Sequence, residues 1–428
     1  MVELPNELWI DIFRYASAAP DPFRPPLHFG TVWRGEKGFQ KEHSYKRYND
    51  SLKTKRHIVL VSKRWNLLAT PILYEHVIVD SLARLHYFST ATAKPRDDVQ
   101  RLDIYLTIDV YEEHQIIDQV ITRAGILDQL AVLLDQLPRL SCLVFLASCI
   151  YDKFITCPKQ QSPAFFLNSA SRRLEYLKWI DQPHVAGVSS IAWASFLTSH
   201  TNLTALDPPV HFFEFKRPLN SEDYRKLTLR EMTADDSFGR IPWLRDIHQN
   251  QASWPVLDRL VRIVPSPFRL GPPSEVSPAQ DDLIATHGYK LTFLHLIFNV
   301  SVETNYTNSY FAQVEQHCQN LQELYITHYW DLQRSLIKSS CRFPNVTTLG
   351  LQNTFSGLLA PRTMKTAFNF VLEARQCFPQ LRTVKFIDET QAMQFCILAE
   401  DWKELGLELR SSGITVQDHS GEDLSEAV

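Results

Sequence analysis

One arrangement of hydrophobic and polar positions recurs along most of the chain. An apolar residue, two variable residues, a second apolar residue, one variable residue and a third apolar residue form a motif whose nine copies begin at Val99, Leu140, Leu174, Leu203, Leu257, Leu291, Leu321, Val346 and Leu381. A weaker tenth copy, Tyr224-x-x-Leu227-x-Leu229, lies in the wide gap between the fourth and fifth. The alternation at the end of each copy predicts a short strand. Starts 25 to 54 residues apart leave room for about one helix between strands.

Helical periodicity fills some of these intervals. One helix is predicted from Tyr111 to Leu137, with one apolar face formed by Ile117, Val120, Ile121, Ala124, Leu127, Leu130, Leu134 and Leu137. A second is predicted over Thr363 to Phe378. We therefore expect an α/β chain with strands inside and helices outside. Over residues 81–417, behind a small helical domain at 1–80, this alternation resembles an irregular leucine-rich-repeat solenoid. Its consensus Asn or Cys is matched only weakly, as at Asn299. The alternative is an unrelated strand-rich domain, in which such short motifs also arise.

The second part of the chain departs from this regularity in several places. The fourth and fifth copies carry Pro208 and Arg262 at their third apolar position. Five prolines between Pro265 and Pro278 predict a loop over about 265–280, either a lid or a plain insertion. The segment from Leu405 to Val416 is expected to close the array, and the acidic tail 418–428 is expected to be mobile.

Two amphipathic helical segments are predicted at the start of the chain. Pro5 suits a first helical turn, and helical spacing relates Leu8, Trp9, Ile12, Phe13 and Ala16. After a segment expected to be irregular, a second helical pattern follows, with Ile58, Val61, Trp65, Leu68 and Ile72 three or four residues apart. Ser62 is predicted to cap a helix that begins at Lys63, and Thr70-Pro71 to end it.

The residues of these helices resemble the F-box over residues 4 to 78. The resemblance rests on Leu-Pro-x-Glu-Leu-x-x-x-Ile-Phe from Leu4, on Leu60-Val61-Ser62-Lys63-Arg64-Trp65-Asn66, and on Ala-x-Pro-x-Leu-Tyr from Ala69. It implies docking to the Skp adaptor, and through it to a cullin. The implied adaptor-facing residues are Leu4, Pro5, Leu8, Ile12, Val61, Trp65 and Leu68. Some of these must instead close the small helical core, and the sequence does not divide the two sets. An unrelated helical hairpin is the alternative.

A long insert at about 17–57 departs from the F-box pattern. It opens with Pro20, Pro22, Pro25 and Pro26, and its second half, 31–57, is basic. The basic residues are Arg34, Lys37, Lys41, Lys46, Arg47, Lys53, Lys55 and Arg56, interleaved with Trp33, Phe39, Tyr45 and Tyr48. Such a segment is either a contact for an acidic partner or nucleic acid, or a solvated loop. Surface insertions of this length are compatible with the F-box resemblance.

Composition narrows the classes of function. The chain has 428 residues, 44 basic and 48 acidic, and a net charge of -4, which gives no electrostatic reason to expect general binding to nucleic acid or an anionic membrane. We expect no signal peptide, because the start has neither a basic region nor a continuous apolar run. The richest apolar run, about nine residues, is too short to span a membrane. The seven cysteines contain no C-x-x-C pair. We expect reduced thiols, no metal, and a cytoplasmic or nuclear location.

The strand residues between the apolar positions are predicted to share the opposite face, which is concave in a solenoid. On that face we expect a protein substrate at Tyr176, Lys178, Phe293, His295, Glu323, Tyr325, Gln352 and Lys385. The alternative is that these are ordinary exposed strand residues.

The sequence contains no recognisable catalytic motif or cofactor site. Gly30 and Gly35 have the spacing of a P-loop, but Glu36 follows where the Lys would stand. The acidic residues beside His114, and the pair Asp388-Glu389, are interpreted as surface charge. The F-box resemblance implies the substrate-recognition subunit of an SCF-type ubiquitin ligase, which is not itself an enzyme. The alternatives are a non-degradative repeat scaffold for protein–protein interaction, either bound to the adaptor or free, and a hydrolase, which would need a deep polar pocket.

Overall fold

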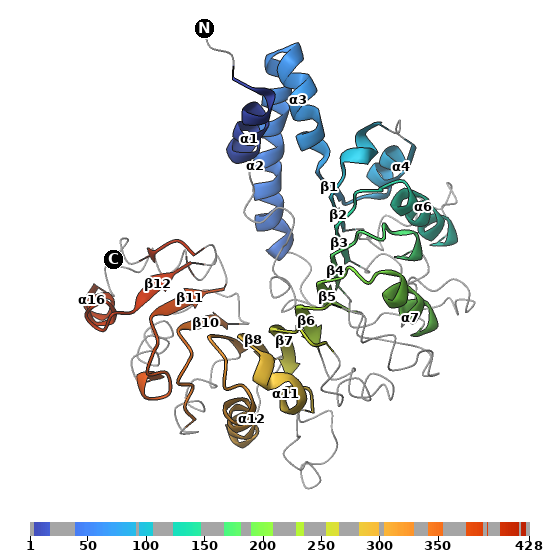
Figure 1. Cartoon of the computed structure of the whole chain (residues 1–428). Helices are drawn as coiled ribbons and strands as arrows, with labels where there is room; N and C mark the ends of the chain where they lie inside the picture. The colour runs from blue at the N-terminus through green and yellow to red at the C-terminus, as the bar shows by residue number, and fades with distance from the viewer. Residues whose placement is uncertain are drawn as a thin grey trace, which may run out of the picture. The chain divides into compact units, whose positions relative to one another are not determined.

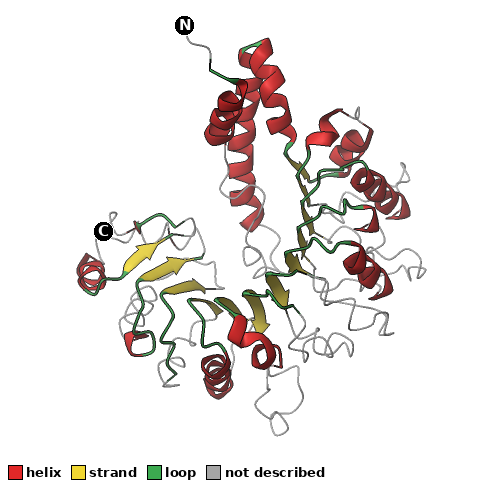
Figure 2. Ribbon diagram, viewed as in Figure 1, coloured by secondary structure: helices red, strands yellow, loops and turns green. Residues whose placement is uncertain are grey.

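The computed structural model of the chain describes residues 4–17, 39–90, 94–105, 123–146, 167–180, 190–208, 228–234, 254–264, 282–298, 304–328, 341–353, 374–387, 392, 403–418 and 421–424. The chain divides into two compact units, Met1–Leu229 and Arg230–Val428. Each unit contains both helices and a parallel sheet (Figures 1 and 2). The fold is therefore mixed α/β, as the alternation of motifs and helical segments predicts.

The first unit opens with three helices that pack against one another, the helical hairpin: α1 Asn6–Ser17, α2 Phe39–Val61 and α3 Lys63–Tyr74 (Figure 1). The predicted cap at Ser62 is confirmed, because its hydroxyl accepts a hydrogen bond from the Trp65 N–H at 3.1 Å. The predicted end at Thr70-Pro71 is wrong, since α3 continues through Pro71 to Tyr74. Pro71 has no N–H to donate, but burial of Ala69 and Ile72 holds the last turn in place.

The second half of the insert is helical rather than irregular. Helix α2 begins at Phe39, nineteen residues before the predicted start, while residues 18–38 lie outside the described part of the chain. The segment from Phe39 to Val61 contains neither Gly nor Pro, so nothing in it interrupts a helix. Contacts with neighbouring segments support α2. The Ser51 hydroxyl donates to the Ser17 carbonyl of α1 at 2.6 Å, and the Tyr48 hydroxyl donates to the His76 carbonyl, beyond α3, at 3.4 Å.

A small aromatic core holds the hairpin together. Phe13, Ala69 and Ile72 are buried at its centre, and Trp65 and Leu68 are partly buried against them. The Trp65 ring lies between two others, with ring centroids 4.9 Å from both Trp9 and Phe13. Rings at this separation contribute attraction beyond the area they bury. The core is thus built by the α1 and α3 aromatics that the sequence pattern places at helical spacing.

In the first unit, the hairpin leads into five parallel strands that pair in chain order. They are β1 His76–Val79, β2 Arg101–Ile104, β3 Cys142–Leu146, β4 Tyr176–Ile180 and β5 Ala205–Asp207. Between them come α4 Leu82–Thr90, the 3-10 helix η1 Lys94–Asp98, α6 Arg123–Asp135 and α7 Ser190–Ser199. Figure 1 shows α4, α6 and α7 on one side of these strands.

The second unit contains seven parallel strands, again paired in chain order. They are β6 Glu231–Ala234, β7 Arg259–Val264, β8 Phe293–Phe298, β9 Glu323–His328, β10 Thr348–Asn353, β11 Thr383–Phe386 and β12 Thr415–Gln417. Its described helices are α11 Asp282–His287, η6 Gly288–Lys290, α12 Thr304–His317, η7 Ala374–Gln376 and α16 Lys403–Ser411.

All nine predicted motif strands are confirmed, as β2 to β5 and β7 to β11. The residue that begins each copy is buried and lies just before its strand. The weak tenth copy is misplaced by five residues. Strand β6 belongs to Leu229-x-x-Met232-x-Ala234, whose three apolar residues are buried, whereas Tyr224 and Leu227 lie outside the described residues. The small Ala234 at the third position hides this copy from a search for large apolar side chains.

The helix predicted over 111–137 is described only as α6, and that predicted over 363–378 only as the short η7. The proline-rich loop 265–280 and Asn299 lie outside the described residues. The closing segment forms α16 and β12. In the described part of the tail, Asp423 forms an antiparallel bridge with Gln417, and the Asp418 N–H donates to the Glu422 carbonyl at 3.0 Å. The mobility of the tail stays a prediction.

Two further expectations concern membranes and thiols. Among the described helices, none is long and apolar enough to cross a bilayer. The four described cysteines, Cys142, Cys318, Cys341 and Cys377, are buried free thiols. The other three cysteines lie outside the described residues.

Candidate protein-docking surface

Exposed apolar side chains gather on the helical hairpin. Of the twelve large hydrophobic side chains exposed in the described part of the chain, seven belong to α1, α2, α3 and the residues next to them. These seven are Leu4, Leu8, Ile12, Tyr15, Leu60, Val61 and Leu67, which we call the apolar docking surface. Exposed apolar side chains gathered on one small group of helices are typical of sites of protein association.

On α1 the exposed residues form a stripe. Leu8, Ile12 and Tyr15 follow one another at four and three residues, so they lie on the same helix face. Leu8 is 48% exposed and Tyr15 is 90% exposed, whereas Phe13 on the opposite face is buried. The helix therefore separates a core face from a surface face, and both faces are apolar.

The corner between α2 and α3 forms the second part of this surface. The last turn of α2, from Ile58 to Val61, is entirely apolar, and Leu60 is 78% exposed. Leu67, one turn into α3, is 76% exposed. Ile58 and Val59 pack against the hairpin core, whereas Leu60 and Val61 are exposed. The exposed half of this turn is therefore a candidate for contact with another protein.

The structure divides the residues predicted to face the adaptor. Leu4, Pro5, Leu8, Ile12 and Val61 are exposed, whereas Trp65 and Leu68 are partly buried against the hairpin core. Sequence analysis missed three exposed residues, Tyr15, Leu60 and Leu67. The helical spacing from Leu8 through Ile12 to Tyr15 would have identified the first of these.

Arg64 fixes the Leu4-Pro5 segment at one edge of this surface. Its guanidinium donates from Nη2 to the Leu4 carbonyl at 3.2 Å and to the Asn6 side-chain oxygen at 2.9 Å. The Pro5 carbonyl accepts the Trp9 N–H at 3.2 Å and so joins the first turn of α1. The start of α1 is thereby tied to the first turn of α3.

Glu75 joins the hairpin to the strands of the first unit. Its buried carboxylate accepts a 2.7 Å hydrogen bond from Arg14 Nη2 of α1. Its backbone carbonyl accepts the N–H groups of Gln100 and Arg101, both at 2.9 Å. Burial lowers the pKa of the nearby Lys55 amine, and the Glu75 charge opposes this shift. Glu75 thus connects α1 with the start of β2.

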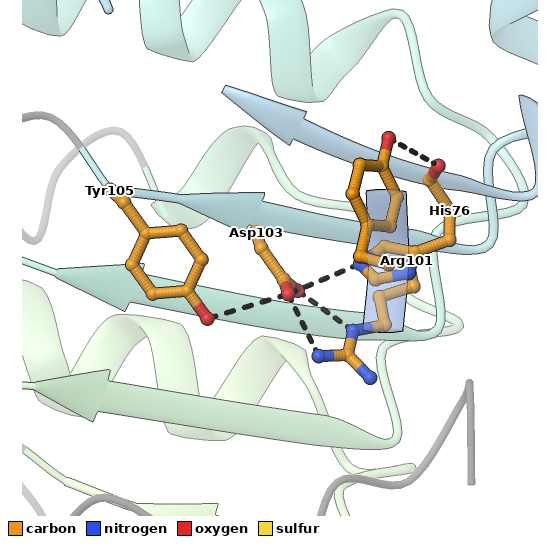
Figure 3. A network of polar contacts seen from close by, with 5 residues as sticks. His76, Arg101, Asp103 and Tyr105 are labelled. Carbon is orange, nitrogen blue, oxygen red and sulfur yellow. Dashed lines mark hydrogen bonds and ion pairs between the residues drawn. The ribbon is translucent and has the colours of Figure 1, made fainter. Parts of the chain in front are cut away.

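A buried polar network joins β1 and β2 (Figure 3). Arg101 donates to both oxygens of the Asp103 carboxylate, at 2.8 and 2.7 Å, and His76 Nε2 lies 3.1 Å from the same carboxylate. The Tyr105 hydroxyl lies 3.5 Å from it. The Tyr48 ring of α2 meets the His76 ring edge-on at 4.8 Å between centroids. The network therefore links α2 with β1 and β2.

The charges of this network are set by burial and by Arg101. Burial alone would raise the pKa of Asp103, but the positive charge of Arg101 and the contact with His76 outweigh it and hold that pKa well below its usual range. Burial lowers the pKa of His76 despite the neighbouring carboxylate. At neutral pH the His76 ring is therefore uncharged and donates its Nε2–H to an ionised Asp103.

The same strands bring a cysteine close to this pair, because Cys142 of β3 is the register partner of Arg101. The Cys142 thiol is fully buried, and burial raises its pKa well above the usual range. A protonated, inaccessible thiol is a poor nucleophile. The hydrogen bonds among His76, Arg101 and Asp103 are therefore suited to joining β1 with β2.

The residues predicted to bind a substrate fall into three places. Tyr176 and Lys178 lie on β4, Lys385 lies on β11, and the other five lie on β8, β9 and β10. Only Glu323 and Lys385 are partly exposed. The other six are buried, in contrast to the exposed face that the strand alternation predicts: Tyr176, Lys178, Phe293, His295, Tyr325 and Gln352.

The cluster on β8 to β10 is built around the Tyr325 ring. This ring lies 4.9 Å from the Phe293 ring and 6.1 Å from the His295 ring, between centroids. Gly350 provides its space, since a Cβ there would lie 2.4 Å from the Tyr325 ring. Arg259 covers the Phe293 ring at 3.9 Å, and its guanidinium lies 3.8 Å from the Glu323 carboxylate.

A hydrogen-bonded chain continues from this cluster into β10. The Thr327 hydroxyl donates to Gln352 Oε1 at 3.0 Å and lies 2.8 Å from His295 Nε2. Burial lowers the pKa of His295 to about 3, so its ring is neutral at neutral pH. Because the Thr327 proton goes to Gln352, the His295 Nε2–H donates to the Thr327 oxygen.

Within the described residues, no group of three or more His, Cys, Asp or Glu side chains could hold a metal ion. The exposed apolar side chains of the hairpin, rather than a polar centre, are thus the feature most typical of a functional site. In comparisons with known proteins, no family model matches the chain, and no curated protein matches its sequence.

Proposed function

We propose that this chain is the substrate-recognition subunit of an SCF-type ubiquitin ligase, and that its helical hairpin docks to the Skp adaptor. The observation that supports this most is the exposure of Leu4, Leu8, Ile12 and Val61. These positions of the F-box-like segment lie on the surface, while Trp65 closes the core behind them. A helix face that is apolar and unpartnered is suited to packing against helices of another protein.

The strands and their connections would form a leucine-rich-repeat-like solenoid that receives the substrate. A turn repeated before the strands supports this. The N–H of the residue that begins each motif copy donates to the carbonyl three residues earlier in all nine copies, as from Leu321 to Cys318 and from Leu381 to Phe378. Repeated hydrogen bonding of this kind is typical of stacked structural units.

Side-chain amides support the same proposal. Asn202, Asn320 and Asn345 each come directly before a motif copy and donate to a carbonyl in the preceding turn, at 2.9, 2.7 and 2.7 Å. Each bond joins one proposed repeat to the next. The amides thus replace part of the consensus asparagine ladder that the sequence matches only weakly.

In this proposal the chain works by proximity and forms no bond with the substrate. The adaptor and cullin would bring a charged conjugating enzyme near the lysines of a bound protein, which raises their effective concentration. In this proposal the chain needs only to bind its two protein partners.

A pull-down from co-expression with a Skp adaptor and a cullin tests the docking surface. We expect Leu8→Asp with Ile12→Asp to abolish recovery of the adaptor, because both side chains are exposed and their loss leaves the core intact. Leu407→Asp, a change at an exposed leucine of α16, is the matched control and should retain the adaptor. Recovery of the adaptor by the double variant would contradict the proposal.

Turnover of partners distinguishes a ligase subunit from a scaffold. We expect removal of the protein from cells to lengthen the half-life of at least one protein that co-purifies with it. Unchanged half-lives of all such partners would favour the non-degradative scaffold. The adaptor pull-down then distinguishes a scaffold bound to the adaptor from a free one.

A further inference from the structure

The insert that departs from the F-box pattern contributes charge to the docking surface. Helix α2 has four exposed residues on one face. Arg56, His57 and Leu60 come three, four and seven residues after Lys53, so all four share that face. Lys53 and Arg56 come from the basic insert. The cationic face of the insert thus runs directly into the exposed apolar corner at Leu60.

The first turn of α3 continues this positive charge. Lys63 and Arg64 are both exposed, and that turn contains no acidic residue. Cations are unfavourable at a helix N-terminus, because the helix dipole is positive there. Local preferences are typically violated where function requires it. Together with Lys53 and Arg56, these residues form what we call the basic corner.

Helix α1 carries acidic residues beside its apolar stripe. Glu7 and Asp11 are exposed on α1, one helical turn apart, beside the stripe of Leu8 and Ile12. In the basic corner the described acidic neighbour is Asp50, whose carboxylate lies 3.4 Å from the Lys53 amine. The apolar surface is therefore bordered by carboxylates on α1 and mainly by cations at the α2–α3 corner.

We infer that the basic insert extends the docking surface and selects a protein partner whose contact face is apolar, with acidic groups opposite the basic corner. This inference rests on the proposed function, because it describes the partner that docks on the hairpin. Charges at the rim of an apolar contact raise the association rate and fix the orientation of the partner. The insert then acts as an electrostatic guide that the F-box pattern alone does not contain.

A protein fits this surface better than nucleic acid does. Leu60, Val61 and Leu67 lie among the cations and would remain exposed against a phosphate backbone. The carboxylates of Glu7 and Asp11 would repel phosphates approaching the same surface. The net charge of the chain, -4, also opposes general attraction of nucleic acid.

Charge reversal in the full-length chain tests the inference. Lys53→Glu with Arg56→Glu reverses the two exposed charges that the insert contributes to the basic corner. Arg172→Glu with Arg173→Glu, at two exposed residues outside the hairpin, makes the same change in net charge. Association rates with the purified Skp adaptor are measured for both variants and the wild type at low and high salt, by surface plasmon resonance.

We expect reversal in the basic corner to slow association at low salt at least roughly tenfold and to weaken its salt dependence, while the control reversal changes neither. Equal rates for wild type and variant would overturn the inference and leave the proposed function standing. If the wild type does not bind the adaptor, the proposed function fails and the inference falls with it. Binding of a DNA duplex that is lost on reversal at Lys53 and Arg56 would overturn the inference in favour of a nucleic-acid partner.

Discussion

At the scale of single residues, Gly350 determines whether the Tyr325 ring can occupy its place. A Cβ at position 350 would lie 2.4 Å from Tyr325 Cγ, far inside van der Waals contact. We expect Gly350→Ala to lower the free energy of unfolding by about 1–3 kcal/mol, because the ring must move within a packed cluster. Urea denaturation measures this change. In a Tyr325→Ala background the same substitution should have little effect. A Gly350→Ala protein as stable as the wild type would contradict this packing.

Burial of His295 predicts a pH dependence of stability. The folded pKa is about 3, below the value of about 6.5 expected in an unfolded chain. The unfolded state therefore binds the proton first as pH falls, so the stabilisation is complete above pH of about 6.5 and is lost toward pH 3. Between pH 7 and 5 the urea midpoint should fall less for His295→Gln than for the wild type. Identical pH slopes would show that the ring is accessible to protons in the folded state.

At the scale of elements, the start of α3 depends on the Ser62 cap. Its hydroxyl satisfies the Trp65 N–H, so Ser62→Ala should destabilise the hairpin by about 1 kcal/mol. Ser62→Asp preserves the acceptor and serves as the control. Thermal unfolding of the full chain and of both variants measures this change. A Ser62→Asp variant as unstable as Ser62→Ala would argue against the cap.

Elements with a strong apolar pattern are the ones that sequence predicts best. The motif starting at Leu321 places Leu324 and Ile326 at alternating strand positions, and all three are buried. Helix α2 was missed because the insert opens with prolines and its helical part is polar, so its stability depends on contacts such as Ser51 with Ser17. Tertiary contacts of this kind leave no periodic signal in a sequence.

Sequence patterns also do not distinguish the core residues of the hairpin from its exposed residues. Trp65 and Leu8 are both apolar residues of the F-box-like segment, and both have helical spacing. Trp65 packs between Trp9 and Phe13, while Leu8 remains 48% exposed, because an apolar residue on either face fits the same pattern. The burial of Tyr176 and Phe293 on the predicted binding face was missed for a related reason. Strand alternation indicates which residues share a face, and not what covers that face.

At the scale of the whole molecule, we propose that adaptor docking and substrate binding belong to different parts of the chain. The hairpin offers exposed apolar surface bordered by charge, and it is connected to the first strands through Glu75 and the Asp103 network. The strand residues that sequence analysis assigned to a substrate are mostly buried. Their role in substrate binding stays a prediction, whereas the hairpin is open to a direct test.

The most direct test is hydrogen–deuterium exchange of the full chain with and without the purified Skp adaptor. We predict slower exchange on adaptor binding in residues 4–17 and 58–70, which contain the apolar docking surface, and unchanged exchange in β8 to β10. The apolar contact should exclude water from these helices and stabilise their hydrogen bonds. Protection confined to the strands, or unchanged exchange in the hairpin at saturating adaptor, would contradict the claim that the hairpin is the docking surface.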